Sequence, residues 1–230
     1  MAKKKAKAPT QVEANVNEIL SKSERFIEKN KNHIINVVLA IVVIVVVILG
    51  IRQYYFIPKE KEAQAAIFPG ENFLANQEWE VALNGNNADY IGFLGVIDDY
   101  GITKTAKLAK AYSGICYYHL NQPEEALRYL KKFSVNDKIF SPVIKGLIGD
   151  CYVDLGEIKE GIKYFNKAAS EANSNVISPI YLKKAGIAYE NIFDYSGAIK
   201  AYQTIKNKYP TSSEANDIDK FIERAKLQIK

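Results

Sequence analysis

The chain has 230 residues and a mass of 25.8 kDa, which leaves room for one ordinary domain with appendages but excludes a large multidomain enzyme. Hydrophobic residues make up 48% and charged residues 25% of the chain, as in folded proteins rather than disordered ones. Two cysteines and two histidines exclude a disulfide-dense scaffold and a four-cysteine zinc or iron–sulfur site, and they leave little for a histidine-based active site.

The net charge of +5 is concentrated in residues 1–33, which contain eight basic and four acidic side chains. Apolar residues recur there at helical spacing: Val12, Val16, Ile19, Leu20, Phe26 and Ile27. This pattern is typical of an amphipathic helix on a membrane surface or on a partner. The alternative is a partly ordered leader whose basic residues only set the membrane topology. We expect 1–33 to be a basic cytoplasmic tail with an amphipathic helix.

Residues 34–51 form an apolar run, IINVVLAIVVIVVVILGI, in which Asn36 is the only polar side chain. As a helix this run is about 27 Å long, close to the hydrocarbon thickness of a bilayer. Tyr54, Tyr55 and Phe56 follow it and are typical of a membrane interface. The sequence therefore predicts a transmembrane helix over 34–56 that ends at Pro58. A cleaved signal peptide is disfavoured by the long polar leader and the lack of a small-x-small site.

The flanking charges predict the orientation of this helix. Eight Lys and Arg precede the apolar run, whereas Arg52, Lys59 and Lys61 are the basic residues just after it. The excess of basic residues before the helix indicates a cytoplasmic N-terminus, with the rest of the chain across the membrane.

Residues 57–102 are predicted to form a stalk and a degenerate first repeat. Its first helix is expected within Glu60–Leu83, where Phe68-Pro69-Gly70 should kink or split it, and its second helix within 90–100.

Residues 103–210 contain three similar segments, which align on Gly114, Gly149 and Gly186 with spacings of 35 and 37 residues. An aromatic residue follows each glycine after three positions, and a second small residue follows after twelve. The expected packing residues of the repeats are Gly114, Tyr117, Ala126, Gly149, Tyr152, Gly161, Gly186, Tyr189 and Ala198. Each unit predicts two antiparallel helices, and 211–230 predicts a capping helix with a polar face.

This pattern of small residue, aromatic residue, turn and second small residue resembles the tetratricopeptide repeat. The resemblance implies an all-α fold, in which a single N-terminal transmembrane helix precedes a tetratricopeptide-repeat α-solenoid. It also implies a binding scaffold, with a concave groove lined by the first helix of each unit. By the repeat register the exposed groove positions are Leu108, Ala111, Ile115, Tyr118, Val143, Gly146, Asp150, Val153, Ile180, Lys183, Ile187 and Glu190.

This groove is mostly apolar, so we expect it to bind hydrophobic or unfolded polypeptide rather than a charged tail. The alternative is that a neighbouring helix, such as the one after the membrane segment, fills the groove and makes it part of the core.

The sequence argues against an enzyme and predicts no catalytic, metal or cofactor-binding residues. It lacks a phosphate-binding glycine loop, and His33 and His119 are its only imidazoles. Cys116 and Cys151 share one register position, where stacked helices lie about 8–10 Å apart, so they are expected to be small buried residues rather than a disulfide. The part after the membrane helix is electrically balanced, so no nucleic acid partner is expected.

The order of parts resembles the YfgM-like ancillary subunits of the SecYEG translocon, in the type found in Bacteroidota. The segments that carry the resemblance include NEILSKSERFIEKNK, GDCYVDLGEIKEGIKYFNKAA and YLKKAGIAYENIFDYSGAIKAY. It implies a single-pass protein of the bacterial inner membrane with a periplasmic repeat domain. The implied partners are SecYEG, a membrane-anchored PpiD-like periplasmic chaperone, nascent or unfolded polypeptide, and membrane lipid. The other hypothesis is a structural adaptor of another envelope machine, in division or outer-membrane assembly.

Overall fold

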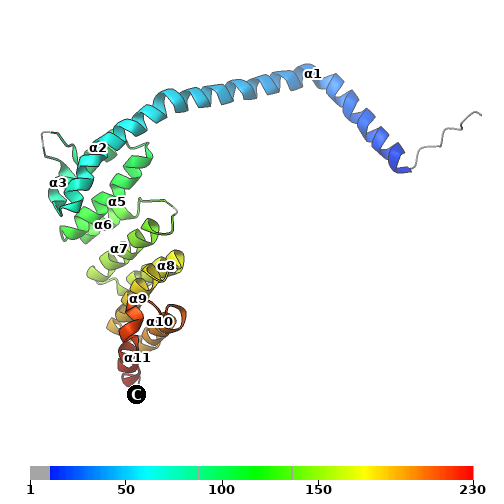
Figure 1. Ribbon diagram of the computed structural model, residues 1–230. Helices are drawn as coiled ribbons and strands as arrows, with labels where there is room; N and C mark the ends of the chain where they lie inside the picture. Colours follow the sequence, from blue (N-terminus) through cyan, green and yellow to red (C-terminus); the bar gives the residue numbers. More distant parts are fainter. Residues whose placement is uncertain (1–10, 87–88, 136, 230) are drawn as a thin grey trace, which may run out of the picture. The chain divides into compact units, whose positions relative to one another are not determined.

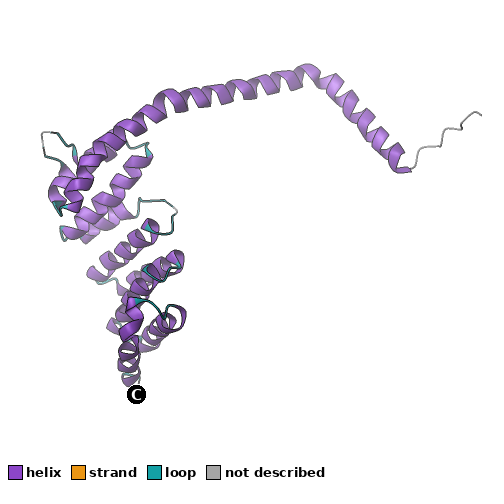
Figure 2. Ribbon diagram, in the orientation of Figure 1, coloured by secondary structure: helices purple, strands orange, loops and turns teal. Residues whose placement is uncertain are grey.

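The computed structural model describes residues 11–86, 89–135 and 137–229, and all regular secondary structure in these ranges is helical (Figures 1 and 2). The chain divides into two compact units, 1–58 and 59–230. The predicted all-α fold class is thereby confirmed for the described part of the chain.

The first unit consists of α1 (Gln11–Ile51) and a π-helical turn, η1 (Arg52–Phe56). The apolar stretch of α1 is long enough to cross a membrane, and none of it is buried by protein. In the predicted amphipathic tail, Phe26 and Ile27 are exposed. The side chains of Val12, Val16, Ile19 and Leu20, and the basic residues of 1–10, lie outside the described residues.

Two prolines do not end their helix as predicted. Pro58 lies in the first turn of α2 (Ile57–Ala75), which follows η1 directly, so the prediction of a helix end there is wrong. The missing N–H of proline costs little in a first turn, and the π turn before it already departs from the regular bonding pattern, since Ile57 N–H donates to Arg52 O. A kink or a split was predicted at Pro69, and the split is wrong, because α2 runs through this residue as one helix.

Tertiary packing explains why α2 tolerates Pro69. Ala63, Ile67 and Gly70 are its buried residues. A Cβ on Gly70 would lie 1.9 Å from the Tyr90 hydroxyl, so this glycine allows α2 to approach the segment before α4 closely. The burial of this face offsets the hydrogen bond that proline removes.

Two short helices, α3 (Trp79–Asn84) and α4 (Gly92–Asp99), complete the beginning of the second unit. Phe93 and Val96 of α4 are fully buried in one cluster with Ile67 of α2 and Ala109 of the next helix. The Tyr90 hydroxyl donates to the carbonyl oxygen of Ala82 (2.8 Å), which ties the segment before α4 to α3.

Three helix pairs then stack in chain order (Figure 1). The pairs are α5 (Lys104–His119) with α6 (Pro123–Leu130), α7 (Phe140–Asp154) with α8 (Ile158–Ala172), and α9 (Ile177–Asn191) with α10 (Tyr195–Lys208). The turns within the pairs share one backbone feature, a left-handed residue seven positions after the register glycine. These residues are Asn121 (φ 59°), Gly156 (φ 80°) and Phe193 (φ 60°).

The register glycines lie where the two helices of a pair come closest. A Cβ would lie 2.4 Å from Leu130 Cγ at Gly114, 2.6 Å from Phe165 Cε1 at Gly149, and 2.2 Å from Tyr202 Cε1 at Gly186. Of the second small residues, Ala126 and Ala198 are fully buried, and Gly161 lies against Val153 and the carbonyl of Gly149. A bulkier side chain at any of these positions would push the helices apart.

The aromatic residues three positions after the glycines lie half-buried on the same faces. Tyr117 stacks on Tyr129 with ring centroids 5.2 Å apart, Tyr152 packs on Tyr164 at 5.4 Å, and Tyr189 packs against Gly197. The chain ends with a 3₁₀ turn, η2 (Ser213–Asp217), and α11 (Ile218–Leu227). Ile218, Ile222 and Ala225 of α11 are buried in one cluster with Tyr202 and Ile205 of α10.

Candidate functional site: a groove along the first helices

The first helices of the repeats, α5, α7 and α9, carry the side chains that the repeat register assigns to the groove. Val143, Ile180 and Ile187 are 38%, 39% and 41% exposed, so part of each of these apolar side chains remains open to solvent. The remaining apolar positions are half-buried: Leu108, Ile115, Tyr118 and Val153. An apolar surface is therefore available on α7 and α9, and less of it on α5.

Two of the expected groove positions are buried, so the prediction that they are exposed is wrong. Ala111 is fully buried in the cluster with Ile144 and Ile148. Gly146 lies under the Tyr181 ring, where a Cβ would be 1.9 Å from Tyr181 Cε1. The position three residues before the register glycine therefore faces the next repeat rather than solvent.

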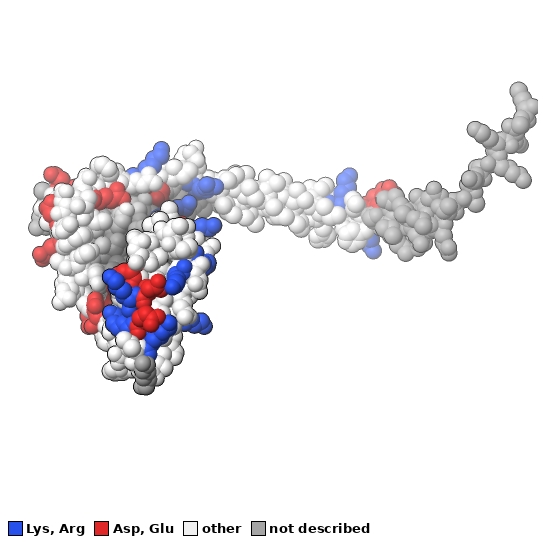
Figure 3. Space-filling model, turned by 60° about the horizontal axis from the view of Figure 1, so that its bottom comes forward, with Lys and Arg blue, Asp and Glu red and all other residues white. Residues whose placement is uncertain are grey.

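The charged groove residues are paired with residues farther along the chain. Asp150 accepts from Lys184 Nζ (2.7 Å), Lys183 Nζ donates to Asp217 (2.8 Å), and Glu190 binds Arg224 Nη2 (2.9 Å). Each pair joins the first helix of one repeat to the next first helix or to the C-terminal segment. Figure 3 shows charges of both signs side by side on the C-terminal helices. The groove therefore offers a partner no large field of one sign.

Burial shapes the electrostatics around Asp150. Burial raises the pKa of Asp150, and the bonded Lys184 ammonium lowers it by a smaller amount. Burial, together with the negative charges of Asp150 and Asp154, raises the pKa of Tyr118 to about 12. Tyr118 is therefore a neutral hydrogen-bonding group at physiological pH, and it cannot act there as a general base.

A shallow cavity of about 170 Å³ lies at this ion pair and is lined by Asp150, Val153, Phe165, Lys184, Ile187, Ala188 and Asn191. Most of its lining is apolar, and its only charges belong to the ion pair. A cavity of this size accepts one apolar side chain of a partner rather than a whole small molecule.

Two exposed apolar residues, each directly before one of these helices, were not predicted. Ile139 and Val176 precede α7 and α9 and are 70% and 72% exposed. Both stand two residues before a Ser-Pro pair, Ser141-Pro142 or Ser178-Pro179, and the second copy follows the first after 37 residues. This recurrence is the signal in the sequence that marks both positions.

The structure also bears on the alternative in which a neighbouring helix fills the groove. Leu108 packs against the cluster to which Ile67 of α2 also belongs, so the helix after the membrane segment contributes to the core at this end of the row. Lys183 and Glu190 are engaged by the C-terminal segment at the other end. Between them, Val143, Ile180 and Ile187 remain exposed, so the filling is partial.

The reactive side chains of the repeats are sequestered. Cys116 and Cys151 are both fully buried and unbridged, and burial raises the pKa of each thiol to about 12. Thiols in this state are poor nucleophiles. Within the described ranges, no group of three His, Cys, Asp or Glu residues is arranged to hold a metal ion.

Comparisons with known proteins identify the repeats. Two family models, both described as tetratricopeptide repeat, match residues 144–175 and 182–212. No curated protein matches the chain. A crystal structure of MamA protein is similar, with a TM-score of 0.52 and 17% identity, over 72% of this chain and 91% of that chain. A second crystal structure of MamA covers 60% of this chain and 88% of its own, with a TM-score of 0.41 and 21% identity.

These findings confirm that the chain contains tetratricopeptide repeats and that its helical fold resembles that of MamA. At such low identity the likeness to MamA shows the fold alone. Tetratricopeptide repeats are helical scaffolds for protein–protein interaction, so the groove is the candidate site for a protein partner.

Proposed function

We propose that this protein is a membrane-anchored, non-enzymatic scaffold that binds apolar segments of unfolded polypeptide in the groove of its repeats. The observation that carries the proposal is the exposed apolar row on α7 and α9, in which Val143, Ile180 and Ile187 lie among charges that are already paired. A partner with a free charged terminus gains little from ion pairs that are already satisfied. An uncharged apolar segment gains from burying the exposed row.

The membrane helix supplies the second part of the proposal. The apolar stretch of α1 would cross the bacterial inner membrane once, with the basic tail in the cytoplasm and the repeats in the periplasm. Anchoring places the groove beside any polypeptide that leaves a channel in the same membrane. The high effective concentration that results makes weak apolar contacts sufficient.

We propose that the channel is the SecYEG translocon, and that this protein is an accessory subunit beside a membrane-anchored PpiD-like periplasmic chaperone. The support is the resemblance in the order of parts, from basic tail through membrane helix to short repeat domain. Chaperone-like binding of emerging polypeptide would follow from the position of the groove.

Binding of unfolded polypeptide tests the groove directly. The full-length protein in lipid nanodiscs would be mixed with a permanently unfolded, fluorescently labelled polypeptide, and its affinity measured by fluorescence anisotropy. We expect the double substitution Ile180→Asp and Ile187→Asp to weaken binding about tenfold or more, since burying the exposed two-fifths of each side chain is worth roughly 0.6–1.2 kcal/mol. Both positions are exposed, so the charges should not disturb the fold.

The control is Phe193→Asp, which places one such negative charge at an exposed apolar residue in the turn between α9 and α10. It should bind as tightly as the unmodified protein. The groove assignment would be contradicted if Phe193→Asp weakened binding as much as the double variant does. It would also be contradicted if both variants bound as tightly as the unmodified protein.

In-cell crosslinking followed by purification from membranes in mild detergent tests the partner. Recovery of the translocon core and a membrane chaperone in near-equal amounts would support the accessory role. A single folded partner from division or outer-membrane assembly, without channel subunits, would favour the adaptor role instead.

A further inference from the structure

A second cavity, of about 370 Å³, lies outside the groove residues, between the end of α6 and one side of α7 and α8. It exists because α6 stops at Leu130 after 8 residues, whereas α8 has 15 and α10 has 14. The last turns of a longer second helix would occupy this space. Its volume falls at the lower end of the range for small-molecule sites, about 300–1,000 Å³.

The floor of the cavity is apolar and its rim is basic. Leu130, Ile144 and Ile148 form the buried part of the lining. The charged residues that line it are Lys131, Lys145 and Lys167, and no Asp or Glu is among the lining residues that the structure describes. The Ser134 and Ser141 hydroxyls line it as well.

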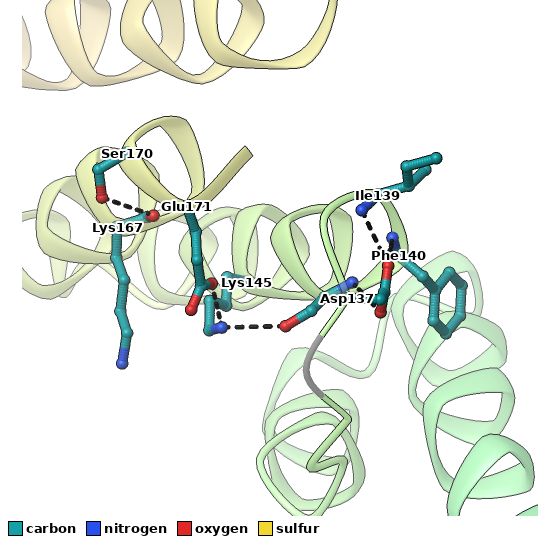
Figure 4. Close-up of polar contacts among 8 residues, drawn as sticks. Asp137, Ile139, Phe140, Lys145, Lys167, Ser170 and Glu171 are labelled. Carbon is teal, nitrogen blue, oxygen red and sulfur yellow. Dashed lines mark hydrogen bonds and ion pairs between the residues drawn. The ribbon is translucent and has the colours of Figure 1, made fainter. Parts of the chain in front are cut away.

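The three ammonium groups differ in how far they are already engaged. Lys145 pairs with Glu171 and donates to Ser141 Oγ (3.0 Å). Lys131 Nζ lies over the Tyr152 ring, 4.8 Å from its centroid. The Lys167 amine has no hydrogen bond or ion pair with any described residue, and Figure 4, which draws it beside Lys145 and Glu171, marks no contact between its amine and either of them. Lys131 is also hydrogen-bonded to Tyr152 and feels the negative charge of Glu157, which does not line the cavity. Lys167 has no carboxylate partner among the described residues, so the mouth of the cavity keeps an excess of positive charge.

We propose that this cavity binds a small carboxylate that carries a short aliphatic chain. The two carboxylate oxygens would accept from Lys131 and Lys167, and the chain would cover the apolar floor. A purely polar anion would leave that floor in contact with water, and an uncharged hydrocarbon would desolvate the ammonium groups without compensation. Such a ligand could be a free fatty acid or the C-terminal residue of a peptide with an apolar side chain.

Calorimetric titration of the full-length protein in lipid nanodiscs tests the proposal, with protein-free nanodiscs as the blank. The probes would be octanoate, octan-1-ol, N-acetyl-leucyl-leucine and the amide of that dipeptide. We expect octanoate to bind more tightly than octan-1-ol. The double substitution Lys131→Gln and Lys167→Gln should weaken octanoate binding at least about tenfold, because charge-assisted hydrogen bonds are lost.

The matched control is Lys107→Gln with Lys220→Gln, which removes two exposed lysines that do not line the cavity. It should bind octanoate like the unmodified protein. A third variant, Ser134→Trp, places a large side chain at the cavity lining and should reduce the affinity without a change in charge.

Comparing the titrations with octanoate, the dipeptide and the dipeptide amide also identifies the source of the carboxylate. Tighter binding of octanoate than of the dipeptide would assign a free fatty acid. Tighter binding of the dipeptide, with loss on amidation, would assign a peptide C-terminus. Equal binding of octanoate and octan-1-ol, no change in the double variant, or no heat up to about 10 mM octanoate would overturn the proposal.

Discussion

Lys184 Nζ on α9 lies 2.7 Å from the carboxylate of Asp150 on α7, so one ion pair joins the first helices of two successive repeats. The Asp150 side chain is 19% exposed and that of Lys184 is 41% exposed. The carboxylate is therefore largely removed from water, and Lys184 is the cation that the structure pairs with it. This relationship makes Lys184 a structural residue as well as part of the lining of the cavity at the ion pair.

Lys184→Gln should lower the free energy of unfolding by about 1–2 kcal/mol near neutral pH, because it leaves a mostly buried carboxylate without its cation. Burial already raises the pKa of Asp150, and loss of Lys184 should raise it further. A raised carboxyl pKa favours the folded state at low pH, and this contribution is lost as the pH rises through that pKa.

The cost of the substitution should therefore shrink on acidification towards about pH 4. Urea unfolding followed by circular dichroism at the two pH values would measure this change. The double variant with Asp150→Asn serves as the control, and it should recover most of the loss at neutral pH. An equal loss at both pH values would argue against an unpaired carboxylate as the cause.

Glu60 connects α2 to the beginning of α5. Its carboxylate accepts from the N–H groups of Lys104 (2.8 Å) and Thr105 (3.2 Å) and from the Thr105 hydroxyl (2.7 Å). Burial raises the pKa of Glu60, but these hydrogen bonds outweigh it and the net pKa is lowered. A carboxyl group with a lowered pKa stabilises the folded state at pH values above its ordinary pKa. This stabilisation is lost as the pH falls through the lowered pKa.

Glu60→Gln should cost about 0.5–1 kcal/mol at neutral pH, as loss of a helix cap does, and it should flatten the decline of stability between about pH 5 and pH 3. Unfolding midpoints measured across this range would test it. Glu62→Gln removes an exposed carboxylate that lies 3.7 Å from Lys59 and should change stability by less than about 0.5 kcal/mol. If the stability of both variants falls with decreasing pH in parallel with that of the unmodified protein, Glu60 has no special role.

Phe193 adopts a left-handed conformation (φ 60°) although it has a side chain and is 78% exposed. Phe193→Gly should raise the free energy of unfolding by about 1 kcal/mol, because glycine takes this conformation without steric cost. Asn121→Gly at the equivalent turn should change the free energy of unfolding less, since asparagine tolerates the left-handed conformation. Thermal unfolding would compare the two, and a lower midpoint for Phe193→Gly would show that the contact between Phe193 and Tyr195 outweighs the strain.

Gly186→Ala should destabilise the third repeat by about 1–3 kcal/mol, because the new methyl group would lie 2.2 Å from Tyr202 Cε1 on the paired helix. Gly50→Ala is the matched change, because nothing lies within 4 Å of a Cβ at that position. Urea unfolding of the repeats should be unaffected by Gly50→Ala. A Gly186→Ala variant as stable as the unmodified protein would mean that the two helices can separate at little cost.

Much of the architecture could be predicted because it depends on periodic features of the chain. The glycines at 114, 149 and 186 recur with an aromatic residue and a second small residue at fixed offsets. Such spacing reflects contacts within one helix pair, which repeat in every unit. The ends of helices were predicted less well. Pro58 falls in a first turn, where proline is tolerated, and at Pro69 the packing of α2 outweighs local preference.

The candidate groove was predicted only in part. The repeat register names the helix positions, but Ala111 and Gly146 are buried against the following repeat. Burial between repeats depends on the angle at which they stack, and no single unit encodes that angle.

The sequence by itself determined the helical class, the membrane-length helix and the repeat register, since each follows from local hydrophobicity and spacing. The tertiary structure decided the pairing of Asp150 with Lys184, because residues 34 positions apart meet only when two repeats stack. It also decided the cavity beside Lys145 and Lys167, because the early end of α6 leaves space only in relation to the helices around it. Contacts between successive repeats set which surfaces stay exposed, and the binding sites proposed for a partner and a ligand lie on those surfaces.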